Sequence, residues 1–213
     1  MIYDDGRNAD TTYVAGVRSE SLITDVGDAY AWATVQHIYD ASGTQTAQTT
    51  TYDDGRVLET AFAGGARATA TMSDLANTYA WASYIATYDG DGIRISRSTA
   101  YDDGRETLNT YVDEVLASSF TADVADEFVW DTIDKSYDAT GVQTEQTNTY
   151  DDGRVLQTLY AEGVRSTATM TDVADAFAWD NYVDTFDDKG DLATRLMPFD
   201  DGREVFPDYL ASR

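Results

Sequence analysis

Short stretches rich in Thr, Tyr, Val and Ala alternate along this chain with polar turns that contain Gly and Asp. Residues of this kind favour β-strands because they pack well on a pleated, half-buried surface. Within residues 57–101 the turns mark off four strands: Val57–Phe62, Ala66–Met72, Thr78–Tyr88 and Ile93–Tyr101. Short connections between successive strands favour antiparallel hairpins. The pattern therefore predicts an all-β chain.

The same pattern returns every 49 residues. The string Tyr-Asp-Asp-Gly-Arg begins at Tyr3, Tyr52, Tyr101 and Tyr150, and a variant of it begins at Phe199. A fixed period of this size indicates repeated supersecondary units. We predict a single repeat domain over residues 1–213, with about four strands in each repeat. The repeats span 3–51, 52–100, 101–149 and 150–198, and a terminal strand follows within 199–213.

A weaker, doubled period overlies the first. Residues 38–81 match residues 136–179 more closely than adjacent repeats match each other, which indicates the duplication of a two-repeat unit of about 98 residues. The third repeat departs locally, because Glu114 stands where the other repeats have Gly16, Gly65 and Gly163. We expect a different turn or a longer loop at that hairpin.

Three closures of the repeat array are open at this point: a propeller, an open single-layer array of hairpins and a curled shell of hairpins. The fourth strand of the first repeat, Thr44–Thr51, is polar on both faces, as the outer edge of a propeller blade would be. Four full repeats leave over a further strand at Arg203–Leu210, however, whereas a closed ring needs a whole number of blades. We predict an open meander, with a four-bladed β-propeller as the alternative.

The recurring Asp and Gly residues have a structural explanation. A three-residue hairpin loop commonly places Gly in the left-handed conformation, and a preceding Asp bonds to nearby backbone N–H groups. The Tyr-Asp-Asp-Gly-Arg string is therefore predicted to be a turn signature. In the third strand, residues two apart share a face, so we expect Tyr79 and Trp81 on one face and Tyr84 and Tyr88 on the other.

Composition limits the classes of partner. The formal net charge of −25 disfavours nucleic acid and anionic membrane surfaces, and it favours divalent cations or cationic partners. The chain has no Cys, so disulfides and thiolate metal sites are excluded. No long apolar run occurs, so we expect no membrane insertion, and no apolar signal segment follows Met1.

Two ligand sites are candidates. An aromatic ladder could stack on sugar rings, and its members would be Trp32, Trp81, Trp130 and Trp179. The competing interpretation is that each Trp anchors the core of its repeat, since aromatic side chains dominate burial energetics. Calcium is the candidate metal because oxygen ligands on flexible loops suit that ion. Its candidate ligands are Asp89, Asp91, Asp187, Asp188 and Asp191.

No catalytic constellation stands out from the sequence. Ser-His-Asp arrangements, Gly-rich phosphate loops and His-Glu metal motifs are absent. The one His, His37, aligns with Ala86, Lys135 and Asp184, so we interpret it as a plain surface residue. Glycoside hydrolysis would need two specific carboxylates, and repeated Asp residues are poor candidates for a unique acid. We therefore predict a non-catalytic structural or adhesive module, with carbohydrate binding as the alternative and a glycoside-active enzyme as a weaker one.

The Tyr-Asp-x-x-Gly turns, the Tyr-Asp-Asp-Gly-Arg string and the segment Thr171–Trp179 resemble tandem repeats near the ends of large secreted, calcium-associated (RTX-like) proteins of marine alphaproteobacteria. The resemblance covers nearly the whole chain, but the chain lacks the glycine-rich nonapeptide of true RTX β-rolls. It implies an extracellular or cell-surface module, exported without an N-terminal signal in this sequence and forming a fragment of a longer protein. We expect carbohydrate or another protein as the partner of this chain.

Overall fold

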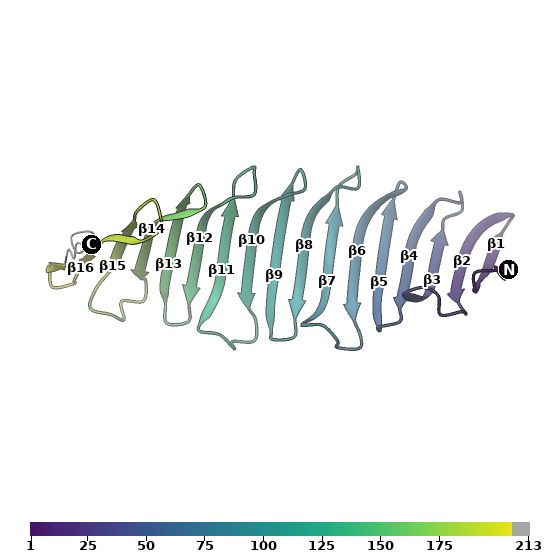
Figure 1. Ribbon diagram of the computed structural model, residues 1–213, viewed down its shortest axis with the longest axis horizontal. Coiled ribbons are helices and arrows are strands. Elements are labelled where there is room, and N and C mark those ends of the chain that lie inside the picture. The colour runs from purple at the N-terminus through teal and green to yellow at the C-terminus, as the bar shows by residue number, and fades with distance from the viewer. Residues whose placement is uncertain (206–213) are drawn as a thin grey trace. The chain divides into compact units, whose positions relative to one another are not determined.

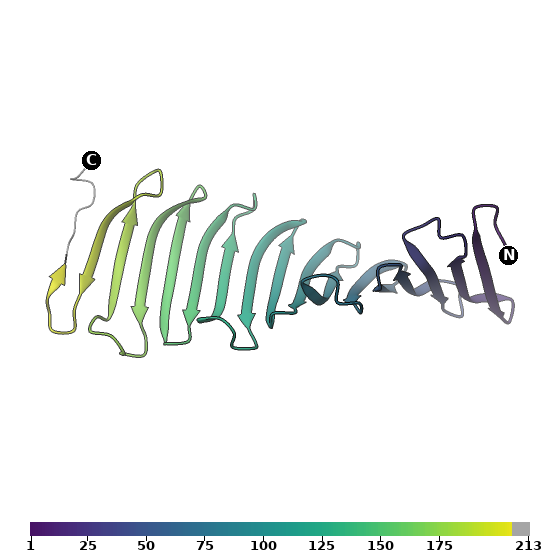
Figure 2. The same cartoon turned by 60° about the horizontal axis from the view of Figure 1, so that its bottom comes forward.

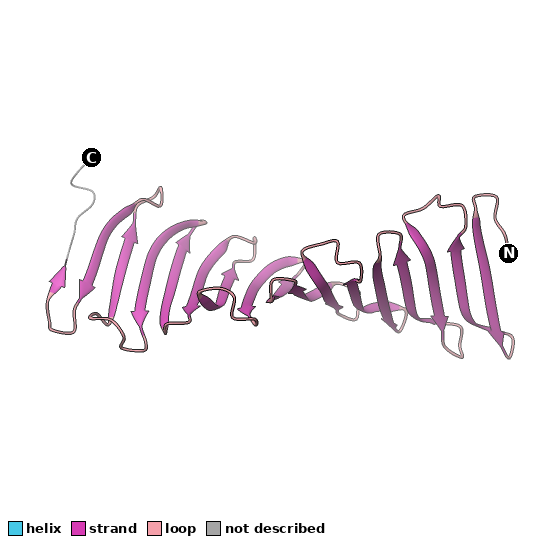
Figure 3. Ribbon diagram, turned by 90° about the horizontal axis from the view of Figure 1, so that it is seen from below, coloured by secondary structure: helices cyan, strands magenta, loops and turns pink. Residues whose placement is uncertain are grey.

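The computed structural model describes residues 1–205, and these residues form β-strands joined by turns (Figure 3). The predicted all-β class is confirmed. None of the described residues forms a helix with the length and hydropathy that crossing a membrane requires. Of the predicted terminal strand at Arg203–Leu210, Glu204–Val205 is a strand, and residues 206–210 lie outside the described part of the chain.

The chain divides into two compact units, Met1–Asp103 and Gly104–Arg213, each of which contains two repeats. The strands of the first unit are β1 (Arg7–Val14), β2 (Val17–Asp25), β3 (Trp32–Tyr39), β4 (Gln45–Tyr52), β5 (Arg56–Ala63), β6 (Ala66–Asp74), β7 (Trp81–Tyr88) and β8 (Arg94–Tyr101). Those of the second unit are β9 (Arg105–Val112), β10 (Val115–Asp123), β11 (Trp130–Tyr137), β12 (Gln143–Tyr150), β13 (Arg154–Ala161), β14 (Val164–Asp172), β15 (Asn181–Phe186), β16 (Leu192–Pro198) and β17 (Glu204–Val205).

Each unit is an open antiparallel meander, in which every strand pairs with the next strand in the chain (Figure 1). The pairing continues through the repeat boundaries: β4 pairs with β5, and β12 pairs with β13. A propeller would place these strands in separate blades. The open array is therefore confirmed, and the propeller alternative is wrong.

The polar fourth strand is an interior strand of the sheet. β4 has hydrogen-bonded neighbours on both sides, β3 and β5. Its Thr and Gln side chains are tolerated there because residues 1–205 form no second layer over the sheet. Within each unit, contacts between strands join only strands that are consecutive in the chain. A strand of a single-layer sheet can be polar on both faces without burying unpaired polar groups.

The two faces of the sheet differ in burial. Thr60, Ala70 and Ala86 are cross-strand neighbours on one face and are only 5%, 4% and 3% exposed. We call this the shielded face. The adjacent positions Glu59, Thr71 and Ile85 share the opposite, open face, where Ile85 is 47% exposed. Among the described residues no large side chain is fully buried, so small residues under their neighbours' side chains take the place of a conventional core.

The turns of each unit lie at two ends of the strands. One end carries the Tyr-Asp-Asp-Gly-Arg turns and the longer turns that precede each Trp, and we call it the aromatic end. The other, the short-turn end, carries two-residue turns such as Gly64–Gly65 and the Asp-x-x-Gly turns such as Asp40–Thr44. Figure 2 shows long and short turns following one another along both units.

The predicted facing of the third strand is wrong. A β-bulge between Trp81 and Ser83 shifts the register, so Trp81 pairs with Tyr101 while Tyr84 pairs with Thr99. Tyr101 and Thr99 are two residues apart on β8 and share the shielded face. Trp81 and Tyr84 are therefore on the same face, with ring centroids 5.4 Å apart. The simple two-residue alternation did not allow for the extra residue, Ala82.

The predicted change of turn in the third repeat is also wrong. β9 and β10 are joined by the two residues Asp113 and Glu114, as Gly64 and Gly65 join β5 and β6. Both central residues have positive φ, 50° at Asp113 and 66° at Glu114, which is the pattern of a type I′ hairpin turn. Glu114 thus adopts a left-handed conformation that glycine normally supplies.

Candidate functional site

The motif residues meet at the aromatic end in a stack of rings and a guanidinium. In the second repeat the Arg56 guanidinium carbon lies 5.0 Å from the ring centroids of both Tyr52 and Tyr79. Tyr79 stacks in turn on Trp81, with ring centroids 5.4 Å apart. The carboxylate of Asp54 pairs with Arg56 at 2.8 Å and accepts a hydrogen bond of 3.1 Å from the Tyr79 hydroxyl. The hydrogen bond from Arg56 holds the pKa of Asp54 below its ordinary value.

Local turn chemistry brings these residues together. The Asp74 carboxylate accepts a 2.6 Å hydrogen bond from the backbone N–H of Tyr79, which folds the long turn back onto the strand ends. Gly55 has a φ of +87°, and a Cβ placed there would lie 2.6 Å from the Cβ of Ala76. Glycine is therefore required both by the turn and by the close approach of the long turn.

The other three repeats contain the same stack of a guanidinium, a ring and an indole, although Phe replaces Tyr79 in the third and fourth repeats and has no hydroxyl to donate. The stacked residues are Tyr3, Arg7, Tyr30 and Trp32 in the first repeat, Arg105, Phe128 and Trp130 in the third, and Tyr150, Arg154, Phe177 and Trp179 in the fourth. The capping carboxylates of their long turns are Asp25, Asp123 and Asp172. Most residues of the recurring Tyr-Asp-Asp-Gly-Arg string thus take part in scaffold contacts.

The four candidate sugar-binding Trp residues are half-buried members of these stacks. Three of them open strands β3, β7 and β11, and Trp179 lies just before β15. Each indole has an aromatic ring offset-stacked against it at 5.2–5.4 Å, a geometry that stabilises aromatic pairs. Each of these rings covers one face of its indole, and a second ring contacts Trp81 and Trp179. The carbohydrate site stays a prediction. The ring stacked on each indole supports the competing interpretation, in which each Trp anchors its repeat.

The candidate calcium ligands lie in two separate turns at the short-turn end. Asp89 and Asp91 lie between β7 and β8, and the other three between β15 and β16. One carboxylate oxygen of Asp89 accepts hydrogen bonds from the backbone N–H groups of Asp91 and Ile93, at 3.0 and 2.9 Å. Asp187 caps its turn in the same way, as do Asp40 and Asp138.

These hydrogen bonds have an electrostatic consequence. They lower the pKa of the Asp40 and Asp138 carboxyls, with the hydroxyls of Ser42 and Thr140 as the largest contributors. Among residues 1–205 no three acidic or His side chains converge as a metal site would need. Calcium binding stays a prediction. Turn capping accounts for the Asp that begins each Asp-x-x-Gly turn in all four repeats.

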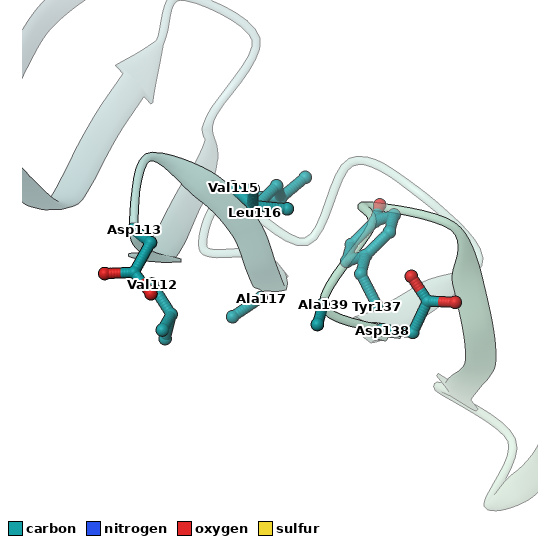
Figure 4. Close-up of a pocket in the computed structure, with 8 residues that line it drawn as sticks. All are labelled: Val112, Asp113, Val115, Leu116, Ala117, Tyr137, Asp138 and Ala139. Carbon is teal, nitrogen blue, oxygen red and sulfur yellow. The ribbon is translucent and has the colours of Figure 1, made fainter.

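A pocket of about 280 Å³ lies at the short-turn end, where the third repeat diverges. Figure 4 shows Val115 and Leu116 on one hairpin and the ring of Tyr137 on the next, with Ala117 and Ala139 between them in this view. Burial raises the pKa of the Tyr137 hydroxyl. The lining also includes Val112 and the acidic Asp113 and Asp138, so the site is an apolar concavity with two carboxylates in its lining.

Corresponding pockets occur in the first and fourth repeats, but an arginine replaces Leu116. Arg18 lies 5.3 Å from the ring of Tyr39 and donates a 3.3 Å hydrogen bond to its hydroxyl. Arg165 lies 5.0 Å from the ring of Phe186. The third repeat therefore has an apolar version of a pocket that elsewhere contains a guanidinium stacked on an aromatic ring.

The shielded face carries a second set of residues that sequence reasoning passed over. His37 pairs across strands with Gln48, and its counterparts in the later repeats form the pairs Ala86–Arg97, Lys135–Gln146 and Asp184–Arg195. His37 is half-buried on this face, with a buried Nδ1. Each of these cross-strand pairs contains one basic side chain or His. This regularity is seen only when the two paired strands are compared, because no single aligned position shows it.

No protein family model matches this chain, and comparison with curated proteins gives no match.

Proposed function

We propose that the chain is a non-catalytic, secreted repeat module that serves as a structural spacer or adhesive surface. The observation that supports this proposal is the use of the recurring residues in scaffolding contacts. Tyr52, Arg56, Tyr79 and Trp81 stack on one another, while Asp54 and Asp74 cap turns. One carboxylate oxygen of Asp74 caps the long turn, while the other is buried without a hydrogen-bond partner, as it is in the counterparts Asp25, Asp123 and Asp172.

The absence of a second layer also fits a spacer. Within each unit a strand contacts only its neighbours in the chain, so stability is built from repeats and their nearest-neighbour interfaces. Such a module can be lengthened without redesigning a core.

Stretching the chain between a surface and a force probe tests the spacer role. We expect stepwise unfolding in which one 49-residue repeat releases at most about 160–175 Å of chain. Refolding on relaxation should restore the same steps. A single all-or-none event that releases the whole chain would contradict the proposal, because a compact cooperative domain behaves in that way.

A further inference from the structure

Arg97 on the shielded face of the first unit has a buried hydrogen-bond donor without a partner. It lies on β8 opposite Ala86 of β7, and its guanidinium carbon is 4.0 Å from the ring centroid of Tyr84. Its Nε is buried and has no hydrogen-bond partner. No carboxylate among the described residues forms an ion pair with it. The chain has 39 acidic residues against 14 Lys and Arg, so an Arg without a carboxylate partner needs an explanation.

The duplicated repeat in the second unit shows what this position can hold. Arg195 corresponds to Arg97, and Asp184 corresponds to Ala86. The Asp184 carboxylate accepts two hydrogen bonds of 2.7 Å, one from Nε and one from a terminal nitrogen of Arg195. Arg195 lies 4.6 Å from the ring centroid of Tyr182, the counterpart of Tyr84. In both repeats the guanidinium lies over a tyrosine ring. Only the fourth repeat has a carboxylate, that of Asp184, on the opposite strand.

We propose that Arg97 is a binding site for a carboxylate-bearing ligand, which takes the place that the Asp184 side chain has in the fourth repeat. A guanidinium presents parallel N–H donors that match a carboxylate in a bidentate pair. Stacking on Tyr84 holds the guanidinium in position before the ligand arrives, which reduces the entropy lost on binding. The methyl group of Ala86 removes the internal acid that would otherwise occupy those donors.

The chemistry is that of an acidic amino-acid side chain or a sugar acid. Both sources offer the same planar anion, and the internal mimic Asp184 indicates a carboxylate in particular. This inference goes beyond the spacer role and does not depend on it, since a scaffold can carry a ligand site on one face.

Nuclear magnetic resonance of the full chain, observing the arginine Nε–H groups, tests the proposal. Sodium acetate is titrated against sodium chloride at equal ionic strength. We expect a saturable shift of the Arg97 signal, and no saturable shift of the Arg195 signal. A non-saturating Arg97 response equal to that of the exposed Arg67 would overturn the proposal. Repeating the titration with N-acetylglutamate and with glucuronate identifies the source, by which of the two saturates Arg97 at the lower concentration.

Two substitutions exploit the duplication. Ala86→Asp supplies the missing acid from within, so the acetate response of Arg97 should weaken by about tenfold or more. Asp184→Ala removes the internal acid from the fourth repeat, so Arg195 should become responsive to acetate. Thermal melts of both variants establish that they fold. An unchanged acetate response of Arg97 in folded Ala86→Asp protein would rule out the proposed carboxylate position.

Discussion

Asp53 and Asp54 are neighbours in the chain, yet their carboxyl pKa values are shifted in opposite directions. Partial desolvation at the aromatic end raises the pKa of Asp53, and the nearby carboxylates of Asp28 and Asp25 raise it further. The hydrogen bond from Arg56 is the largest cause that lowers the pKa of Asp54. The same opposition recurs at Asp151 and Asp152 and at Asp200 and Asp201. One Asp of each pair therefore opposes folding at neutral pH, and the other supports it.

This opposition predicts opposite effects of Asp53→Asn and Asp54→Asn. The folded-state pKa of Asp53 lies above 3.8, so its cost to stability is present at neutral pH and disappears as pH falls through that pKa. The contribution of Asp54 is present above 3.8 and is lost as pH falls through its lowered folded-state pKa. At pH 7 and low salt we expect a higher melting temperature for Asp53→Asn and a lower one for Asp54→Asn.

Melting temperatures measured between pH 7 and pH 3 provide the check. The gain from Asp53→Asn should shrink as pH falls toward 3.8, because the wild-type carboxyl becomes protonated in that range. Added salt should reduce it as well, since the repulsion acts between exposed charges. Equal melting temperatures for the two variants at pH 7 would contradict the assignment of opposite roles.

The guanidinium stack predicts a measurable loss of stability in Arg56→Ala. Two cation–π contacts of about 0.5–1 kcal/mol each, together with a weak surface ion pair, give an expected loss of about 1–2 kcal/mol. Arg203→Ala is the matched control. Its side chain is 74% exposed, against 29% for Arg56, and it lies over one ring, that of Phe199. Urea unfolding should therefore show a smaller loss for the control. Comparable losses would mean that the second ring contributes nothing.

The left-handed conformation of Glu114 predicts that Glu114→Gly stabilises the third repeat. A non-glycine residue at positive φ costs about 1–2 kcal/mol, and glycine adopts the same φ without that cost. Because glycine also gains freedom in the unfolded chain, we expect a net gain of about 1 kcal/mol in the free energy of unfolding. The reverse change Gly65→Glu, at the matching position where a side chain would meet open space, should cost a similar amount. A destabilised Glu114→Gly variant would indicate a contact of the Glu side chain that outweighs the strain.

The strands and turns could be predicted from the sequence because the residues that specify each of them are close together in the chain. The interval between Tyr52 and Tyr101 marked the repeat, and the Gly of each Asp-Asp-Gly turn required a left-handed conformation that the structure contains. Strand boundaries were accurate to a few residues. β7 begins at Trp81 rather than Thr78, because the hydrogen bond between Asp74 and Tyr79 includes the intervening residues in the long turn.

The candidate sites depended on information that single positions do not contain. The bulge at Ala82 places Trp81 on the same face as Tyr84, whereas regular alternation would put them on opposite faces. A periodic pattern in the sequence cannot reveal such an extra residue. The alignment of His37 with Ala86, Lys135 and Asp184 suggested tolerance at one position. The cross-strand partner was needed before Arg97 appeared as an arginine that lacks its carboxylate. Pairing register is a property of the sheet, and it becomes readable only after the strands are placed.

The stacked indoles predict a weak response of Trp fluorescence to neutral sugars. Trp81 has Tyr79 stacked on it and Tyr84 tilted against it, both at 5.4 Å, so a sugar ring would have to displace an aromatic partner. We expect no saturable change in emission on titration with neutral oligosaccharides. The variant Tyr79→Ala should increase quenching of the emission by acrylamide, because it uncovers one indole of the four. A saturable blue shift of the wild-type protein with an oligosaccharide would instead favour the carbohydrate-binding alternative, and it would place the ligand against the indoles in preference to the scaffold contacts that now occupy them.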